Sequence, residues 1–298
     1  MKDLLSFLSE SGIKFSENEP MKNHTSFRIG GPAKLFIEPK TEEELSAVLK
    51  KCRESKTEYT VIGNGSNLLV SDDGISKAVI RLSGEFEKIE LLDETTVKAG
   101  AGASLGSLCR FALENSLSGL EFAFGIPGSV GGAAFMNAGA YGGEMKDVVL
   151  SCSHIDREGN GGVLSKEQLG FSYRKSAYGE NGFIVTSVTF GLQKGEKGAI
   201  EEKMNDLLGR RKEKQPLSFP SAGSVFKRPE GYFAGALIEQ SGLKGKTVGG
   251  AQVSEKHAGF IVNIGSATCK DVKDLIEYCQ KTVYDNFGVK LETEIKMI

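Results

Sequence analysis

The residues best suited to chemistry in this sequence include a run of small ones between Gly125 and Gly143. This segment, GIPGSVGGAAFMNAGAYGG, contains seven glycines and four alanines and has no Lys, Arg, Asp or Glu. Glycine lets the backbone approach a bound molecule closely, because it has no Cβ atom. A flexible linker would be more polar, whereas Ile126, Phe135 and Tyr141 are interleaved here. We therefore expect a loop that contacts a large ligand, with a linker or close helix–strand packing as alternatives.

A second glycine-rich segment, GNGSN at residues 63–67, lies between two short apolar runs. Successive glycines allow backbone N–H groups to converge on an anion, and Asn64, Ser66 and Asn67 add neutral polar contacts. The alternative is a β-turn with its usual Asn, Gly and Ser residues. Two ligand loops about sixty residues apart favour one extended cofactor that combines a diphosphate with a flat ring system.

Two familiar nucleotide motifs fail in this chain. The turn that begins at Gly100 would need a further glycine where Leu105 stands to complete the Rossmann pattern GxGxxG. Gly245-Lys246-Thr247 imitates the end of a P-loop, but the required earlier glycine would fall at Gln240. Neither segment is therefore assigned to a nucleotide.

A third motif keeps a different enzyme class open. Residues 102–106 read GASLG, a GxSxG pattern at an expected strand-to-helix turn, where the nucleophile of a serine hydrolase belongs. Ser104, a later Asp and His257 would have the chain order of such enzymes. Close packing of small residues explains the same turn, and nothing identifies the Asp. A serine hydrolase is therefore an alternative interpretation.

Composition excludes several other classes. The net charge of −2 and the absence of a long basic tract give no footprint for nucleic acid. His24, His154 and His257 are far apart and form no metal-binding motif, and five cysteines without CxxC spacing indicate scattered reduced thiols. The first residues lack the apolar core of a signal peptide, and no run approaches the ~20 apolar residues of a membrane span. We expect a cytoplasmic protein with no membrane, nucleic-acid or metal partner.

Hydrophobic periodicity predicts alternating helices and strands, hence an α+β protein that divides near residue 194. Thr41 and Glu44 form a capping box ahead of an amphipathic helix. The expected helices are 41–52, 105–115, 201–214, 232–240 and 271–287, and the expected strands are 33–38, 59–62, 68–71, 79–82, 89–92, 95–99, 183–192, 260–264 and 289–296.

Taken together in this order, the motifs are similar to those of the UDP-N-acetylenolpyruvoylglucosamine reductases, also called UDP-N-acetylmuramate dehydrogenases. The resemblance covers almost the whole chain. The short gap between Arg174 and the strand near Phe183 resembles the compact type II branch. The matching segments are residues 23–31 (NHTSFRIGG), GNGSNLLV, GIPGSVGGAAFMNAGAYGG, 173–176 (YRKS), 222–227 (AGSVFK), 256–260 (KHAGF) and 291–295 (LETEI).

The resemblance implies a two-lobed FAD-binding domain of the PCMH, or vanillyl-alcohol-oxidase, type over residues 1–193, with lobes of roughly 1–82 and 83–193. A smaller α+β substrate-binding domain over 194–298 would follow, its last strand carrying Glu294. It also implies that NADPH reduces the enolpyruvyl ether of UDP-N-acetylglucosamine through FAD, giving UDP-N-acetylmuramate for peptidoglycan synthesis. No obligatory protein partner is expected.

Residue roles follow from the resemblance only where residues match. Arg174, Ser224 and Glu294 match the three catalytic residues of the family. Without the resemblance, none of these residues taken alone would predict an active site. The FAD-binding residues would be Gly63, Asn64, Gly65, Ser66, Asn67, Leu68, Pro127, Gly128, Ser129, Gly132, Asn137 and Gly139. The substrate-binding residues would be Tyr173, Arg210, Lys214, Lys227, Tyr232 and His257.

One residue departs from the family pattern GSxFKNP. Lys227 is followed by Arg228 and Pro229, so the expected Asn is missing. This leaves one substrate hydrogen bond in doubt, and Arg228 is the candidate to replace it by pairing with a phosphate or carboxylate.

Overall fold

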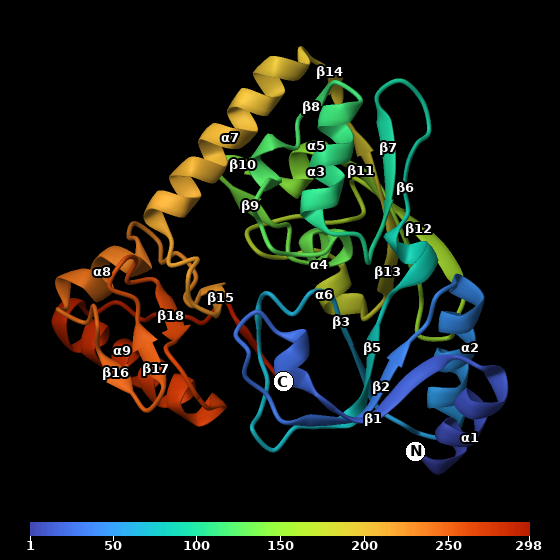
Figure 1. The fold of residues 1–298 in the computed structure, drawn as a ribbon, viewed down its shortest axis with the longest axis horizontal. Coiled ribbons are helices and arrows are strands. Elements are labelled where there is room, and N and C mark those ends of the chain that lie inside the picture. The colour runs from blue at the N-terminus through green and yellow to red at the C-terminus, as the bar shows by residue number, and fades with distance from the viewer. The chain divides into compact units, whose positions relative to one another are not determined.

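The computed structural model describes all 298 residues, and their contacts divide the chain into two compact units. Unit 1 comprises residues 1–17, 35–64 and 77–210, and unit 2 comprises residues 18–34, 65–76 and 211–298. Each unit has a separate apolar core. Helices and strands alternate along the chain, so the predicted α+β class is confirmed (Figure 1).

The first sheet has the strand order β1-β2-β5-β3, in which β3 and β5 run parallel. Thr41 begins the helix α2 as predicted, because its hydroxyl accepts a hydrogen bond from the Glu44 N–H at 3.2 Å. The other half of the predicted capping box is wrong, since the Glu44 carboxylate accepts from the Lys40 N–H at 2.7 Å instead of from Thr41. Apolar side chains of helices α1 and α2 and of strand β2 lie in the unit 1 core. The elements are α1 (Lys2–Ser11), β1 (Lys14–Pro20), β2 (Pro32–Glu38), α2 (Glu42–Glu54), β3 (Tyr59–Ile62) and β5 (Ile75–Arg81).

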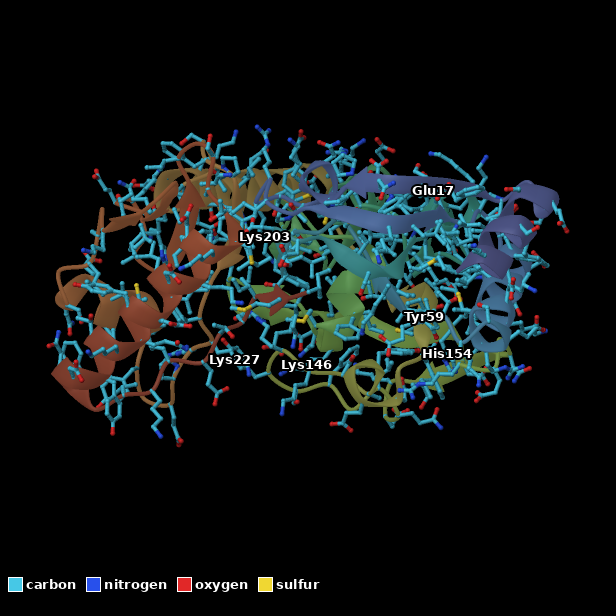
Figure 2. All side chains as sticks on the ribbon, turned by 90° about the horizontal axis from the view of Figure 1, so that it is seen from below. Glu17, Tyr59, Lys146, His154, Lys203 and Lys227 are labelled. Carbon is cyan, nitrogen blue, oxygen red and sulfur yellow. The ribbon has the colours of Figure 1, made fainter.

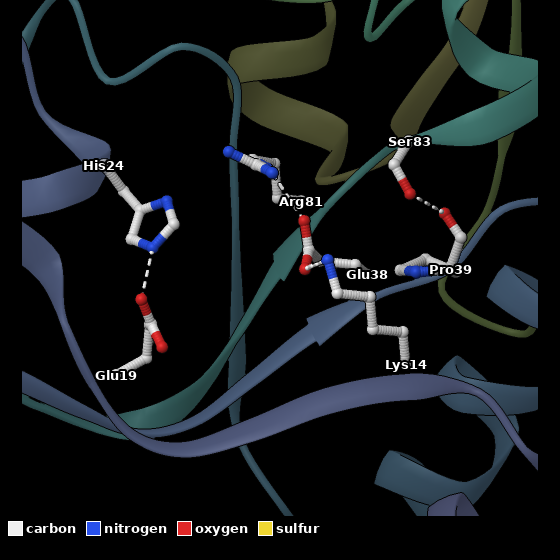
Figure 3. Close-up of polar contacts among 7 residues, drawn as sticks. All are labelled: Lys14, Glu19, His24, Glu38, Pro39, Arg81 and Ser83. Carbon is white, nitrogen blue, oxygen red and sulfur yellow. Dashed lines mark hydrogen bonds and ion pairs between the residues drawn. The ribbon is translucent and has the colours of Figure 1, made fainter.

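Ion pairs of one carboxylate connect strands β1, β2 and β5 of this sheet. Glu38 is buried and lies between Lys14 and Arg81, each 2.5 Å away (Figure 3). Burial would raise the pKa of Glu38, but the hydrogen bonds and charges of Lys14 and Arg81 outweigh it and hold the pKa below its ordinary value. The buried carboxylate is thus paired, as its low exposure requires.

The second sheet of unit 1 is antiparallel, with the order β12-β11-β13-β7-β6. Its elements are β6 (Ile89–Leu91), β7 (Thr96–Gly100), β11 (Val149–Ile155), β12 (Gly161–Ser165) and β13 (Ile184–Gly191). The helices around it are α3 (Leu105–Glu114), α4 (Val130–Phe135), α5 (Met145–Val148), α6 (Tyr178–Asn181) and α7 (Lys197–Lys214). The short elements are η2 (Gly84–Glu87), β8 (Leu117–Ser118), η3 (Glu121–Ala123), β9 (Gly139–Ala140), β10 (Gly143–Glu144) and β14 (Gln193–Lys194).

Unit 2 is built on the antiparallel sheet β15-β18-β17-β16, with α9 packed against β16 and β17. A parallel pair, β19 with β4, joins the last residues of the chain to residues 68–69. The elements are η1 (Met21–His24), β4 (Leu68–Leu69), β15 (Ser221–Ser224), α8 (Ala234–Gln240), β16 (Thr247–Val248), β17 (Ala251–Val253), β18 (Phe260–Asn263), α9 (Cys269–Phe287) and β19 (Lys296–Met297).

Two segments from the first third of the chain belong to unit 2 because their apolar residues complete its core. Phe27, Ile29 and Leu69 are buried there together with residues of α8 and α9. The division by contacts therefore falls at residues 210/211, inside α7, and differs from the boundary expected after residue 193. That boundary, as a division between cofactor and substrate roles, stays a prediction.

The strand expected over residues 289–296 is wrong. Only an isolated bridge between Thr293 and Phe226 and the short β19 are present there. The backbone changes partner at Glu294, whose N–H donates to the Val225 carbonyl, whereas the Lys296 N–H donates to the Asn67 carbonyl. A segment that pairs with two different neighbours in turn cannot form one continuous strand.

Candidate functional site

The small-residue segment packs against the turn that precedes α3. The Val130 N–H donates to the Ala103 carbonyl of this turn, and the Gly131 N–H donates to the Ala101 carbonyl, both at 2.8 Å. A Cβ on Gly131 would lie 2.7 Å from the Ala101 Cβ. Close packing thus accounts for the absence of a side chain at Gly131, which was one of the alternatives considered for this segment.

Gly63, the first residue of GNGSN, meets the small-residue segment within unit 1. A Cβ on Gly63 would lie only 2.3 Å from the Ser129 hydroxyl oxygen. Ser129 itself is buried and accepts a hydrogen bond from the Gly132 N–H at 3.3 Å. Direct packing on Ser129 therefore explains why residue 63 has no side chain.

Gly65 has a structural reason to be glycine. Its φ of +62° is left-handed, and a Cβ there would lie 2.0 Å from the His24 carbonyl oxygen. The Ser26 N–H donates to the Gly65 carbonyl at 3.2 Å. His24, which pairs with Glu19 at 2.8 Å (Figure 3), belongs to the same part of unit 2. Close contact with residues 24–26 therefore requires Gly65 whether or not a ligand binds beside it.

Ser224 and Glu294 are brought together within unit 2. Ser224 ends β15, and the next residue, Val225, accepts a hydrogen bond from the Glu294 N–H at 2.7 Å. The Ser224 hydroxyl donates weakly to two carbonyls, Phe226 at 3.3 Å and Gly259 at 3.5 Å. Both contacts are long, so the hydroxyl can turn to another acceptor at little cost.

Arg174 belongs to unit 1 and lies in a tight turn. Ser172 and Lys175 exchange two backbone hydrogen bonds of 3.1 Å, and Arg174 between them has a left-handed φ of +57°. Its guanidinium donates to the Gly139 carbonyl at 3.4 Å and stacks on the Tyr173 ring at 5.0 Å. A non-glycine residue in this conformation is strained, and such residues concentrate at functional sites.

Asn137, expected to bind the cofactor, is completely buried. Its amide donates to Glu144 and to the Ser172 carbonyl and accepts from the Lys146 N–H, each at 3.0 Å. Both amide N–H groups and the carbonyl are thus engaged inside the protein.

The expected substrate-binding residues differ in how they are engaged. Lys227 pairs with Glu292 at 3.0 Å, and Arg210 pairs with Asp206 along α7 at 2.8 Å. Tyr232 is about half exposed. His257 accepts a hydrogen bond at Nδ1 from the Gly259 N–H at 3.1 Å, and burial lowers its pKa. Lys214 is exposed at the end of α7.

The sequence interpretation selected Arg210 and not its neighbour Arg211, which is buried whereas Arg210 is exposed. The burial of Arg211 is indicated by its spacing along α7. Ile200, Met204 and Leu207 form a buried stripe at intervals of three or four residues, and Arg211 continues this stripe. Its guanidinium donates to Gln215 at 3.4 Å.

Arg228, the departure from the family pattern, lies over an exposed aromatic ring. Its guanidinium is 4.0 Å from the centre of the Phe233 ring, within range of a cation–π interaction. The ring is 62% exposed, so both groups are at the surface of unit 2. An asparagine at this position could not make the same contact.

Ser104 has a structural role that explains the GxSxG pattern. Its hydroxyl accepts from the Ser107 N–H at 3.0 Å and shares a hydrogen bond with the Ser107 hydroxyl at 2.7 Å. Ser104 is therefore the N-cap of α3. The one histidine of unit 1, His154, is bonded to Tyr178 and stacked on Phe183. These contacts support packing and capping rather than a hydrolase nucleophile.

Thiols and metals offer no further chemistry. All five cysteines are buried free thiols, and burial raises the pKa of Cys109, Cys152 and Cys279 to about 12, far from the range of a reactive thiolate. No group of three His, Cys, Asp or Glu residues is placed to hold a metal ion. No helix is both long and apolar enough to cross a membrane.

Comparison with known proteins decides the family. The UDP-N-acetylenolpyruvoylglucosamine reductase of Clostridioides difficile (strain 630) is 52% identical over 99% of this chain and 96% of its own length. That of Clostridium novyi (strain NT) is 50% identical over 100% of this chain and 95% of its own. The chain belongs to the UDP-N-acetylenolpyruvoylglucosamine reductase family. The resemblance inferred from the motifs is confirmed.

Two family models match separate parts of this reductase chain. Residues 33–165 match a model described as FAD binding domain, and residues 215–298 match the C-terminal domain of UDP-N-acetylenolpyruvoylglucosamine reductase. The chain is thus an FAD-dependent oxidoreductase.

Solved structures agree with this assignment. The UDP-N-acetylenolpyruvylglucosamine reductase of Thermus caldophilus is similar with a TM-score of 0.82 and 39% identity, covering 96% of this chain and 98% of that one. Berberine bridge enzyme from Eschscholzia californica shares the fold, with a TM-score of 0.51 and 20% identity over 65% of this chain and 44% of its own. The predicted PCMH-type FAD-binding fold is confirmed.

Proposed function

We propose that this reductase converts the enolpyruvyl ether of UDP-N-acetylglucosamine to the lactyl ether with NADPH, and that Arg174, Ser224 and Glu294 carry the chemistry. The proposal includes a cytoplasmic location, since both substrates are water-soluble nucleotides, and no obligatory protein partner. It rests on family membership over nearly the whole chain. The observation that supports the residue roles is the hydrogen bond from the Glu294 N–H to the carbonyl of Val225, the residue that follows Ser224.

The two glycine-rich segments would hold the cofactor. Gly63 and Ser129 are in contact, which supports placing the two segments at one site. Residues 63–68 and 127–132 would hold FAD, with the small side chains leaving room for a flat ring system. When bound, FAD would supply hydride-transfer chemistry between NADPH and the methylene carbon of the substrate.

Arg174 would stabilise the charge that develops on the substrate carboxylate once the hydride has arrived. Its guanidinium is planar and permanently charged, and it is oriented by the Tyr173 ring and by a long hydrogen bond to the Gly139 carbonyl. A cation fixed before the reaction needs no rearrangement when the negative charge appears, which is the main source of electrostatic catalysis.

Ser224 would supply the proton that completes the reduction. An alcohol is a weak acid, but the carbon of an enolate is basic enough to draw the proton from Oγ when the two are in reach. The long contacts to Phe226 and Gly259 leave the Oγ–H group able to turn towards that carbon. Glu294 would act together with Arg174 on the charge of the substrate carboxylate.

The remaining polar residues would bind the nucleotide part of the substrate. Lys214, Lys227, Tyr232 and His257 all belong to unit 2, and cationic side chains there can pair with a diphosphate. Arg210 and Tyr173 belong to unit 1. Arg210 would have to exchange its ion pair with Asp206, and Lys227 its pair with Glu292, to serve this role.

The test is the spectrum and the turnover of the purified protein. A flavin spectrum, NADPH oxidation that depends on the enolpyruvyl UDP-sugar, and a product heavier by two hydrogens would support the proposal. A yellow protein that leaves NADPH unchanged would instead be a flavin-binding module without turnover. A colourless protein labelled by a fluorophosphonate at Ser104 would favour the hydrolase interpretation.

A further inference from the structure

The turn that carries Arg174 is held by a buried side chain from another loop. The Asn137 amide donates to the Ser172 carbonyl at 3.0 Å, at the start of the turn closed by Ser172 and Lys175. Asn137 is itself left-handed, with a φ of +42°, and has no exposed surface. A tight turn with a left-handed Arg needs such external support, because the isolated turn would relax.

The same amide reaches a carboxylate. The second N–H of Asn137 Nδ2 points to Glu144 Oε2, also at 3.0 Å, and the carbonyl Oδ1 accepts from the Lys146 N–H. The two N–H donors and the carbonyl of Asn137 are therefore used within unit 1. Its side chain has no donor left for a cofactor.

Glu144 connects this network back to the guanidinium. Gly139, whose carbonyl accepts from Arg174, pairs with Glu144 in the two-stranded hairpin β9–β10. The hydrogen bond from Lys146, the bond from Asn137 and the charge of Arg174 hold the pKa of Glu144 below its ordinary value, so the carboxylate is ionised. One hairpin thus presents both a carbonyl and a negative charge to Arg174.

We propose that Asn137 and Glu144 are positioning residues that fix the backbone and guanidinium of Arg174 for its role with the substrate. The inference rests on the catalytic role of Arg174 proposed above. It assigns Asn137 to the arginine turn and not to direct contact with the flavin.

The test uses the flavin-loaded enzyme and measures its two half-reactions separately. Asn137→Asp keeps the size of the side chain and tolerates a left-handed backbone, but it removes both N–H donors. We expect flavin content and the rate of reduction by NADPH within about twofold of the parent. Reoxidation by the enolpyruvyl substrate should slow at least tenfold, because only that half-reaction uses Arg174.

A double-mutant cycle separates positioning from a general structural effect. Arg174→Lys alone should slow reoxidation strongly, and adding Asn137→Asp should slow it little further, because the arginine is already absent. Fully additive effects, or equal slowing of both half-reactions, would overturn the positioning role. If Arg174→Lys reoxidises at the parent rate, the proposed role of Arg174 is wrong and the positioning role falls with it.

Two further variants keep the test decisive if Asn137→Asp does not fold. Glu144→Gln preserves an acceptor for Asn137 and removes only the charge, so it should slow reoxidation about three- to tenfold with normal reduction by NADPH. Glu17→Gln is the matched control, because it makes the same exchange of a carboxylate for an amide at an exposed position of β1 (Figure 2). Its half-reactions should both match the parent, and a Glu144→Gln enzyme that also matched the parent would overturn the role of Glu144.

Discussion

The Asn67 side chain and the Glu294 backbone are joined by a hydrogen bond, from Nδ2 to the carbonyl oxygen at 3.2 Å, although 227 positions separate the two residues. The Lys296 N–H donates in turn to the Asn67 carbonyl at 2.9 Å. On its other side, the Glu294 N–H is bound to Val225. The backbone of a proposed catalytic residue is therefore held at both ends, partly by the glycine-rich GNGSN segment.

Asn67→Ala should consequently affect Glu294. Loss of the hydrogen bond should lower the free energy of unfolding by about 1 kcal/mol and slow substrate-driven reoxidation roughly three- to tenfold. Asn286→Ala is a matched control for stability, because it removes a 3.2 Å bond to Ser241 at the exposed end of α9. If the flavin-loaded Asn67→Ala enzyme reoxidises at the parent rate while flavin content falls, the amide serves the cofactor instead.

Gly65→Ala and Gly288→Ala form a second matched pair. Both glycines are left-handed, with φ values of +62° and +66°, so each alanine should cost about 1–2 kcal/mol. A Cβ at Gly288 meets nothing within 4 Å, whereas one at Gly65 would collide with the His24 carbonyl, adding about 1–3 kcal/mol. Urea unfolding measures the difference, and equal losses in the two variants would show that the contact with His24 is not tight.

Ser104→Ala tests the alternative assignment of the GxSxG motif. Loss of the N-cap should lower the free energy of unfolding by about 1 kcal/mol and leave NADPH oxidation unchanged. Thr268→Ala, which removes the corresponding cap of α9, should cost a similar amount. Lost activity with unchanged stability would return Ser104 to the active site.

The stability of the protein should depend on the protonation of His257. Burial, with a smaller effect of Lys244, lowers its pKa below the ordinary value of 6.5. The unfolded chain therefore binds a proton more readily, so stability is full above about pH 6.5 and falls as the pH drops below it. His154, whose pKa burial also lowers, contributes in the same direction.

His257→Asn should make this dependence shallower, because Asn does not titrate but can still accept from the Gly259 N–H. The measurement is the free energy of unfolding at about pH 7.5 and about pH 5.5. The remaining slope should come partly from His154. An unchanged or steeper slope would mean that folding does not oppose protonation of His257.

Local sequence signals predicted much of unit 1 and of α9. The capping residue Thr41 and the apolar spacing behind it correctly predicted α2, and the helix expected over residues 271–287 is present as α9. These elements depend on residues three or four positions apart, which a sequence displays directly. The motif resemblance likewise identified the family, because each matched segment is continuous in sequence.

Long-range pairing explains what the sequence did not predict. Phe27 and Leu69 lie in segments that look like part of the first domain, yet they are buried in the unit 2 core. The alternation around Glu294 resembles a strand, but the backbone there is shared between Val225 and Asn67. The several roles of the Asn137 amide also depend on residues up to 35 positions away. Such contacts leave no local pattern.

The most direct test of the account is the single turnover of Ser224→Ala, followed by flavin absorbance in a stopped-flow instrument. Reduction by NADPH should match the parent, because that step needs no proton from Ser224. Reoxidation by the enolpyruvyl UDP-sugar should slow 10²–10⁴-fold, about 3–5 kcal/mol of barrier, and Ser224→Cys should retain more activity than Ala. Reoxidation of Ser224→Ala at the parent rate would show that the proton comes from elsewhere and contradict the proposed mechanism.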